Sequence, residues 1–271
     1  MIVPPLACPV CGLELDAGPR AFGCAEGHSF DVARQGYVNL APEGAPEGDD
    51  ADMVAARAGF LAGGWFDPLT RALAEAAGDP VPGAVVELGA GTGHHLAAVL
   101  DALEDRAGVA LDASVYAARR AARAHPRATS VVADAWGALP LLDDSVAVAL
   151  VVFAPRAGAE IARVLAPGGV LVVATPAPHH LRELAGPMGL LDVDPRKADR
   201  LRDTLAPELE QEDERELEWS MALDHEATRA LAAMGPSARH TGTAGGDGLR
   251  DLPDPLTVTA AVTVSRWRVP R

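Results

Sequence analysis

The sequence predicts an α/β fold, a Rossmann-like parallel sheet covered by helices, with a small N-terminal metal-binding module in front of it. From residue 84 onward, short apolar runs typical of buried strands alternate with segments of helical periodicity. All three cysteines, by contrast, lie within the first 24 residues, followed by a histidine at position 28. The first pattern predicts the sheet, and the second predicts the metal-binding module.

Length and composition bound the class of protein. With 271 residues and 49% hydrophobic content, the chain can bury a substantial core in one or two domains. Its longest apolar run, Val146 to Ala154, is much shorter than the ~20 residues of a membrane-spanning helix. The first residues also lack the basic start of a secretion signal. We therefore expect a cytoplasmic protein without a membrane partner.

The cysteines and the histidine form two close pairs, Cys8 with Cys11 and Cys24 with His28. Two such pairs of thiolate and imidazole ligands, each on a turn, can complete a tetrahedron around zinc. Because four protein ligands leave no position open for a substrate, we interpret this metal as structural rather than catalytic. The alternative is a cluster of buried thiols beside an incidental histidine.

This zinc-binding module is expected to occupy residues 1–40. Residues 41–52 are rich in proline, glycine and acidic residues and lack apolar periodicity, so we interpret them as a linker. The linker is expected to let the module move relative to a domain at residues 53–271. Asp52 is expected to cap a helix that begins near Met53.

The centre of the prediction is a glycine-rich turn between a strand and a helix. The apolar run Ala84 to Leu88 stops at Gly89, Gly91 and Gly93, and an apolar-periodic stretch from Leu96 to Leu103 follows. Glycines leave such a turn without Cβ atoms, and the first N–H groups of the next helix stay unpaired. The turn is therefore predicted to hold a cofactor, although a tight turn without function uses the same residues.

The spacing of the glycines distinguishes between two cofactors. A dinucleotide fingerprint requires G-x-G-x-x-G, and here the third glycine comes one residue too early. Glu87 at the strand end instead completes the form Glu-x-Gly-x-Gly-x-Gly, which resembles motif I of the class I S-adenosylmethionine (SAM) methyltransferases. The resemblance implies a SAM site that includes Glu87, the three glycines, Thr92 and His94.

Acidic residues end the next two predicted strands. The apolar stretch Gly108 to Leu111 ends at Asp112, where a carboxylate can accept hydrogen bonds from the hydroxyls of a ribose. Ser130 to Ala133 ends at Asp134, which in class I methyltransferases would lie near the adenine. We therefore assign both aspartates to the cofactor site.

The rest of the predicted sheet follows in order. Val146 to Phe153 is expected as a buried fourth strand, Glu160 to Leu165 as a helix, and Val170 to Ala174 as a fifth strand. Leu256 to Trp267 alternates for much of its length, which predicts a last, antiparallel strand at or near the sheet edge. Residues 182–250 resemble generic methyltransferases poorly and are expected to hold a substrate-recognition insert.

The net charge of −15 does not suit a nucleic-acid partner, because such proteins usually show a basic surface. Taken alone, it favours a small-molecule substrate. Arg119, Arg120 and Arg123 would nevertheless share one face of a helix, either as a solvated face or as an RNA contact. The acidic stretch Glu208 to Glu218 is expected to be solvated surface.

Longer stretches resemble one family of RNA methyltransferases, the RlmA family. These stretches are CPVCGLELDAGPRAFGCAEGHSFDVARQGYVNLA, DMVAARAGFLAGGWFDPLTRAL, VFAPRAGAEIARVLAPGGVLVVATPAPHHLREL and MGPSARH. Members of that family methylate N1 of a guanine in a domain II hairpin of 23S ribosomal RNA. The resemblance implies SAM and Zn²⁺ as cofactors, that RNA hairpin as the partner, and a homodimer.

The resemblance also adds residues to the cofactor site. An aromatic side chain in the helix break lies against the cofactor in the family, which implies Phe66, with Trp65 as the competing residue. An aromatic face can attract the sulfonium cation of SAM, although an aromatic side chain at a helix break is more often core. The motif T-P-x-P-x-H-L implies His180 as a residue that lines the cofactor site.

The target base is expected to lie at the end of the fourth strand, near Phe153, Ala154 and Pro155. Amino-group methyltransferases place Asn/Asp-Pro-Pro-Tyr there, and the apolar Ala154 argues against methylation of an exocyclic amine. Backbone carbonyls of these three residues can orient the base, and Phe153 can stack on it. The general base, which could also be water, is not assigned.

The stretches VARQGYVNL, DMVAARA, GTGHHLA and MGPS resemble the branch of the family that modifies nucleotide 748 more than the branch that modifies nucleotide 745. The first branch includes the tylosin-resistance methyltransferase, which implies resistance to tylosin-type macrolides; housekeeping modification is the alternative. Two other functions stay open: methylation of a small molecule by SAM, and a non-catalytic zinc- and RNA-binding assembly factor.

Overall fold

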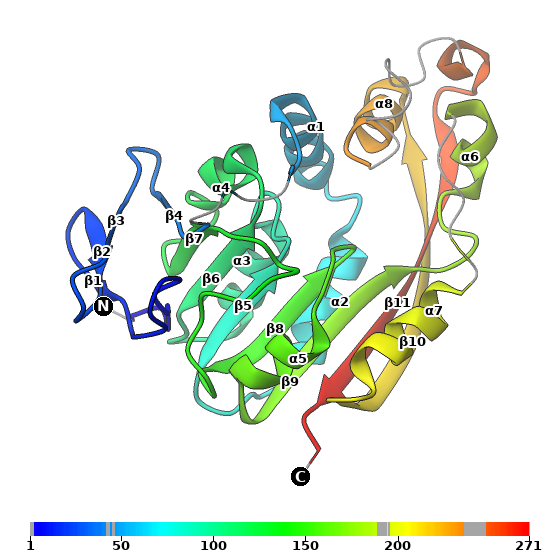
Figure 1. Cartoon of the computed structure of the whole chain (residues 1–271). Coiled ribbons are helices and arrows are strands. Elements are labelled where there is room, and N and C mark those ends of the chain that lie inside the picture. Colours follow the sequence, from blue (N-terminus) through cyan, green and yellow to red (C-terminus); the bar gives the residue numbers. More distant parts are fainter. Residues whose placement is uncertain are drawn as a thin grey trace.

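The computed structural model describes residues 3–41, 44, 47–188, 194, 196–235 and 248–270. In this part of the chain, the strands form one sheet of eight and a separate sheet of three (Figure 1). The large sheet has the order β10-β11-β9-β8-β5-β6-β7-β4, and the small one has the order β1-β2-β3. The small sheet belongs to the N-terminal module, which lies beside the β4 edge of the large sheet.

The strands of the large sheet match the predicted α/β order. Five parallel strands form its centre, and β11 is antiparallel to β9. The predicted last strand next to the sheet edge is therefore confirmed. The strands of the large sheet are β4 (Tyr37–Asn39), β5 (Ala84–Leu88), β6 (Gly108–Asp112), β7 (Ala128–Val132), β8 (Val146–Val152), β9 (Leu165–Pro176), β10 (Glu210–Leu223) and β11 (Leu256–Arg268).

Helices cover both faces of this sheet. In Figure 1, α5 and α7 lie in front of the sheet and α2 and α3 lie behind it, whereas α1 and α8 contact each other above it. The helices are α1 (Ala51–Ala62), α2 (Asp67–Ala77), α3 (His94–Ala102), α4 (Val115–Ala121), α5 (Gly158–Val164), α6 (Arg182–Met188), α7 (Lys197–Leu205), α8 (His225–Ala233) and the 3-10 helix η1 (Gly248–Asp251). None of the described helices is long and apolar enough to span a membrane.

Strand β5 shows how the sheet separates two cores. All five of its residues are buried, and successive side chains point to opposite faces of a strand. Val85 packs with Leu73 of α2 and Leu96 of α3 in one core, and Val86 packs with Ile161 of α5 in the other. The continuous apolar run in the sequence therefore reflects burial of a parallel strand on both of its faces.

The acidic stretch was predicted as solvated surface, and its side chains are indeed exposed in the first half of β10. The sequence did not predict that this stretch is also a strand, paired antiparallel along β11. Charged side chains suit an edge strand, because they prevent the unpaired edge from pairing with another chain. The described part of the region 182–250, which was expected as an insert, therefore supplies one strand of the sheet as well as α6, α7 and α8.

The N-terminal module packs directly on the large sheet. Strand β4 pairs in parallel with β7, Leu6 forms a bridge with Leu141, and Leu15 and Val38 belong to the same core as Val131. The expectation that the linker lets the module move relative to the domain at residues 53–271 is therefore wrong. A ribbon too small to form its own core buries its apolar side chains against the larger domain.

The start of α1 also differs from the prediction by two residues. The N-cap is Asp50 and not Asp52, since the N–H of Met53 donates to Oδ1 of Asp50 over 2.9 Å. Asp52 lies in the first turn, where its negative charge interacts favourably with the positive end of the helix dipole. The remaining strands, all in the module, are β1 (Asp16–Ala17), β2 (Ala21–Gly23) and β3 (Ser29–Asp31).

Candidate active site

The four predicted zinc ligands come together. The Sγ atoms of Cys11 and Cys24 are 3.7 Å apart, and Nδ1 of His28 lies 3.6 Å from Sγ of Cys8 and 3.3 Å from Sγ of Cys24. All four ligand atoms lie within 4.8 Å of one another. Zn–S bonds of about 2.3 Å give a tetrahedron with edges of about 3.8 Å, so the four side chains fit this ion.

Turns present these ligands. The N–H of Gly12 donates to the carbonyl of Cys8, and the N–H of Gly27 donates to the carbonyl of Cys24. Both glycines have positive φ, 76° and 84°, a backbone conformation that costs other residues free energy. Each turn thus carries one pair of ligands, as the spacing in the sequence predicts.

The glycine-rich turn between β5 and α3 lies against the end of β8 and against α1. Gly89, Gly91 and Gly93 all have positive φ. A Cβ on Gly89 would lie 2.5 Å from Cβ of Ala154, and one on Gly91 would lie 3.2 Å from Cδ of Arg57. The turn therefore leaves no room for side chains, which brings its backbone close to the end of β8 and to α1.

Asp112 ends β6 beside this turn. Its Oδ2 accepts the N–H of Gly91 and its Oδ1 accepts the N–H of Ser114, both over 2.8 Å. Burial raises the pKa of Asp112, and the two backbone hydrogen bonds oppose this effect. A carboxylate oxygen that accepts one hydrogen bond retains a second lone pair. The side chain therefore fits the predicted contact with the hydroxyls of the SAM ribose.

Glu87 lies beneath the turn. It is 1% exposed, and its Oε2 accepts the N–H of Leu96 in the first turn of α3 over 3.0 Å. Burial raises the pKa of Glu87 to about 8, which keeps the carboxyl protonated at neutral pH. In this position the side chain joins the end of β5 to the start of α3 and supports the turn from below.

Thr92 and His94, which were predicted as cofactor residues, line a groove together with Arg120 and Arg123. The neighbouring His95 was not predicted as a site residue. It is 8% exposed, its Nδ1 lies 2.9 Å from Oγ1 of Thr70, and burial lowers its pKa to about 3. His95 is therefore a neutral, hydrogen-bonded core residue.

Four rings from separate segments meet beyond the turn. The ring of Phe66 lies 6.3 Å from Phe153, 6.4 Å from His180 and 5.7 Å from Trp219, measured between centroids. Trp219 was missed from the sequence, because it lies on β10 directly after the acidic stretch. Its indole N–H donates to the carbonyl of Trp65 over 2.9 Å, so Trp65 contributes its backbone to this cluster.

Phe153 has the most unusual position among these rings. It is 38% exposed although it directly follows the buried strand β8, and its φ is +53°. A bulky residue rarely adopts this backbone conformation, which is typically retained at functional sites. The next residue, Ala154, is the one that faces Gly89, so the exposed ring and the glycine-rich turn adjoin each other.

The remaining predicted residues take up positions around this centre. His180 accepts the N–H of Ala261 at Nδ1 over 3.1 Å, which fixes its ring. Oδ1 of Asp134 accepts the N–H of Trp136 over 2.8 Å, and Asp134 follows Ala133, whose N–H donates to the carbonyl of Asp112. The two predicted aspartates therefore lie on neighbouring strand ends.

Arg57 of α1 is a second residue of this site that the sequence did not reveal. Its Nη2 lies 2.5 Å from Oδ2 of Asp49 and donates to the carbonyl of Met234 over 2.8 Å. Its buried Nε lacks a hydrogen-bond partner among the described residues, and its positive charge lowers the pKa values of both Glu87 and Asp112. Arg57 therefore joins the linker, α1 and the end of α8 above the turn.

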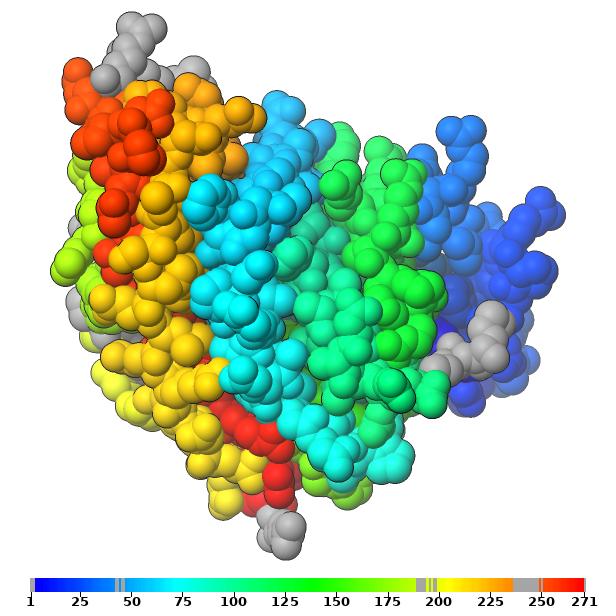
Figure 2. Space-filling view, turned by 180° about the vertical axis from the view of Figure 1, so that it is seen from behind, coloured from blue at the N-terminus to red at the C-terminus, as the bar shows by residue number. Residues whose placement is uncertain are grey.

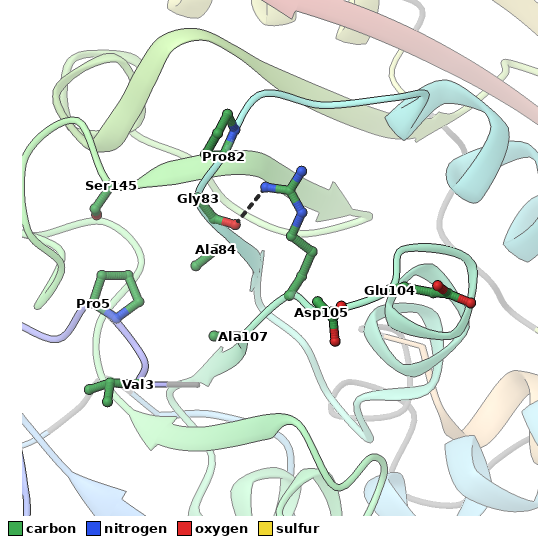
Figure 3. Close-up of a pocket in the computed structure, with 10 residues that line it drawn as sticks. Val3, Pro5, Pro82, Gly83, Ala84, Glu104, Asp105, Ala107 and Ser145 are labelled. Carbon is green, nitrogen blue, oxygen red and sulfur yellow. Dashed lines mark hydrogen bonds between the residues drawn. The ribbon is translucent and has the colours of Figure 1, made fainter. Parts of the chain in front are cut away.

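A larger cavity lies at the opposite ends of the strands. It measures about 570 Å³ and is lined by Val3, Pro5 and Gly83, among others (Figure 3). The guanidinium of Arg106 donates there to the carbonyls of Pro80, Val81 and Gly83. Ligands of open α/β sheets bind at the carboxyl ends of the strands, and this cavity lies at the amino ends of β5 and β6. It is therefore not the cofactor site.

Two family models match this chain. The model for the N-terminal part of RlmA, a zinc ribbon, matches residues 6–44, and a methyltransferase domain model matches residues 85–169. The first covers all four predicted zinc ligands, and the second covers the glycine-rich turn, Asp112 and Phe153. The predicted zinc ribbon, SAM-dependent methyltransferase domain and their two cofactors are thereby confirmed.

Curated relatives extend the similarity over nearly the whole chain. A protein of Micromonospora griseorubida named "Putative 23S rRNA (guanine-N(1)-)-methyltransferase" is 50% identical over 289 residues, which cover 98% of this chain and 98% of that protein. The 23S rRNA (guanine(748)-N(1))-methyltransferase of Streptomyces fradiae is 51% identical over 240 residues, which cover 87% and 86%.

Among solved structures, the YcgJ protein of Bacillus subtilis is similar with a TM-score of 0.52 and 17% identity. The match covers 74% of this chain and 97% of YcgJ. At this level of identity, the similarity concerns the fold alone, and it agrees with the predicted Rossmann-like sheet.

Proposed function

The chain belongs to the family of 23S rRNA (guanine-N1)-methyltransferases, and from this membership we propose that it methylates N1 of guanine 748 in a domain II hairpin of 23S rRNA. The structural observation that best supports this proposal is the exposed ring of Phe153 beside the glycine-rich turn. An unpaired base can stack on such a ring. The 51% identical relative that carries nucleotide 748 in its name supports the choice of nucleotide.

SAM supplies an activated methyl group, so the protein has to orient the base and exclude water. We assign Asp112 to the ribose of SAM and Asp134 to the region of the adenine. Phe66 and His180 line the site beside Phe153, which the distances of 6.3 and 5.8 Å from the Phe153 ring support. Glu87 acts through the turn that it supports.

The backbone carbonyls of Phe153 to Pro155 orient the target guanine, whose N1 proton leaves to water. Two observations support water as the proton acceptor. Nδ1 of His180 already accepts a backbone N–H, and the carboxyl of Glu87 is buried beneath the turn. Ala154 provides no polar side chain for an exocyclic amine, which supports a ring nitrogen as the target.

The zinc ribbon holds the RNA hairpin in this proposal, and the enzyme acts in the cytoplasm as a homodimer. The ribbon packs on the β4 edge of the sheet, so it can present a hairpin at a fixed distance from Phe153. The methyl group at nucleotide 748 would confer resistance to tylosin-type macrolides. The minimum inhibitory concentration of tylosin for a sensitive host that expresses this protein tests this part of the proposal.

The decisive experiment incubates the zinc-loaded protein with undermodified 23S rRNA and methyl-labelled SAM, followed by mass spectrometry across the domain II hairpin. The expected product is 1-methylguanine at nucleotide 748. Label at another nucleotide would contradict the assigned target, and label only in small molecules would support the alternative that the net charge of −15 favours.

Two variants test the role of Phe153. Truncation in F153A removes the stacking surface, which is worth about 1–3 kcal/mol per base, so we expect methylation of RNA to fall by roughly tenfold or more. F153W retains an aromatic face and should restore much of this activity. SAM affinity, measured by calorimetry, should stay within about twofold in both variants. Equal activity of F153A and the wild type would remove Phe153 from the base site.

A further inference from the structure

A groove of about 320 Å³ opens between α1, the start of α3 and the end of α4. These helices lie on the face of the molecule shown in Figure 2. Arg120 and Arg123 line one side, Thr92 and His94 line the floor at the glycine-rich turn, and Leu61 belongs to an apolar wall on α1. No acidic residue is among the described residues that line this groove.

Several arginines of this acidic chain are neutralised by ion pairs, and the two arginines of the groove are not among them. Arg163, for example, lies 2.7 Å from Glu160 and 2.6 Å from Asp143. Arg120 and Arg123 are both exposed, and neither forms an ion pair with the described part of the chain. Two positive charges without an acidic partner among the described residues therefore face the same small groove in a protein of net charge −15.

Other features of the groove also favour an anion. It borders the first turn of α3, a helix of nine residues, where the helix dipole is positive. His94 is half-buried, and burial lowers its pKa, which leaves a neutral imidazole. A neutral imidazole carries one N–H that can donate to a phosphate oxygen, as can the hydroxyl of Thr92.

The groove also adjoins the zinc ribbon. The turn before β4 lies against the end of α4, since a Cβ on Gly36 would be 3.3 Å from Cβ of Ala122. Arg34, on the same turn, is exposed. The backbone of an RNA that follows this surface would pass from the ribbon to the groove. The floor of the groove is the glycine-rich turn, which also adjoins Phe153 through Gly89 and Ala154.

From these observations we propose that the groove binds a backbone phosphate of the substrate RNA between the zinc ribbon and the target base. This inference rests on the proposed function, because it takes RNA as the substrate. It explains how a strongly acidic protein can hold a polyanion, since only a local patch of positive charge has to face the phosphates.

The test compares R120Q and R123Q, made singly, with R71Q. Arg71 of α2 is also exposed and outside the groove, so each of the three variants loses one surface charge. Binding of the domain II hairpin RNA is measured by fluorescence anisotropy at several salt concentrations, and methylation is measured with labelled SAM. We expect R120Q and R123Q to bind RNA roughly tenfold more weakly. The slope of log affinity against log salt concentration should become shallower by about 0.7 for each phosphate that is no longer neutralised.

These measurements distinguish failure of the groove proposal from failure of the proposed function. If the wild-type protein methylates the RNA but R120Q and R123Q bind the RNA as tightly as R71Q does, the groove proposal is refuted and the proposed function stands. Wild-type protein that neither binds nor methylates the RNA would refute both. Zinc content and SAM affinity should be unchanged in all three variants; a SAM affinity reduced tenfold in R120Q or R123Q would assign the groove to the cofactor and overturn the proposal.

Discussion

Replacement of Glu87 by glutamine is expected to change the pH dependence of stability. Burial raises the pKa of Glu87 to about 8 in the folded protein, compared with 4.5 as its ordinary value. Because the folded-state pKa is the higher one, the stability that the protonated carboxyl contributes is complete below about pH 4.5 and is lost as the pH rises through 8. At 1.36 kcal/mol per pKa unit, the full difference between the two pKa values corresponds to roughly 5 kcal/mol in the free energy of unfolding.

Glutamine keeps an oxygen that can accept the N–H of Leu96 but cannot ionise. The free energy of unfolding of E87Q should therefore rise relative to the wild type by about 3 to 4 kcal/mol between pH 5 and pH 8. Urea denaturation of the zinc-loaded protein, followed by circular dichroism, measures this difference. E104Q, at an exposed carboxyl, serves as the control. Parallel pH profiles of E87Q and the wild type would refute a buried, protonated Glu87.

The other predictions concern the two cofactors. D112N should weaken SAM binding by about 1–3 kcal/mol, because a charged acceptor is lost; calorimetry that finds equal affinity would place the ribose elsewhere. C24S should lose zinc, as measured by mass spectrometry, and should lower the melting temperature of the whole chain, since the ribbon shares a core with the sheet; full zinc content would contradict the ligand set. G89A places a Cβ 2.5 Å from Cβ of Ala154 and should weaken SAM binding by roughly tenfold or more, whereas G59A meets nothing within 4 Å and should retain wild-type affinity.

The sheet could be predicted well because its signals are local. The continuous apolar run of β5 and the alternation in β11 each follow from which faces of the strand are buried. Strand β10 could not be predicted in the same way. Its first half is charged and exposed, so it lacks an apolar pattern, and only its hydrogen bonds to β11 make it a strand.

The mobility of the zinc ribbon was predicted wrongly for a related reason. A linker rich in proline and glycine shows that no helix or strand connects the two parts, but it does not show whether their surfaces bury each other. Leu6 and Val38 look like isolated apolar residues in the sequence. In the fold they complete the core next to Val131, which attaches the ribbon to the sheet.

The sequence by itself determined the groups with fixed local spacing: the zinc ligands, the glycine-rich turn, and the acidic residues that end the strands. Their chemistry depends on residues a few positions apart, so a linear pattern is sufficient to reveal it. Only the tertiary structure decided which distant residues meet at that turn. The packing of helices and strands places Arg57 above Gly91, Trp219 beside Phe66, and Arg120 and Arg123 at the groove beside the turn. Side chains far apart in sequence leave no periodic signal of such a meeting.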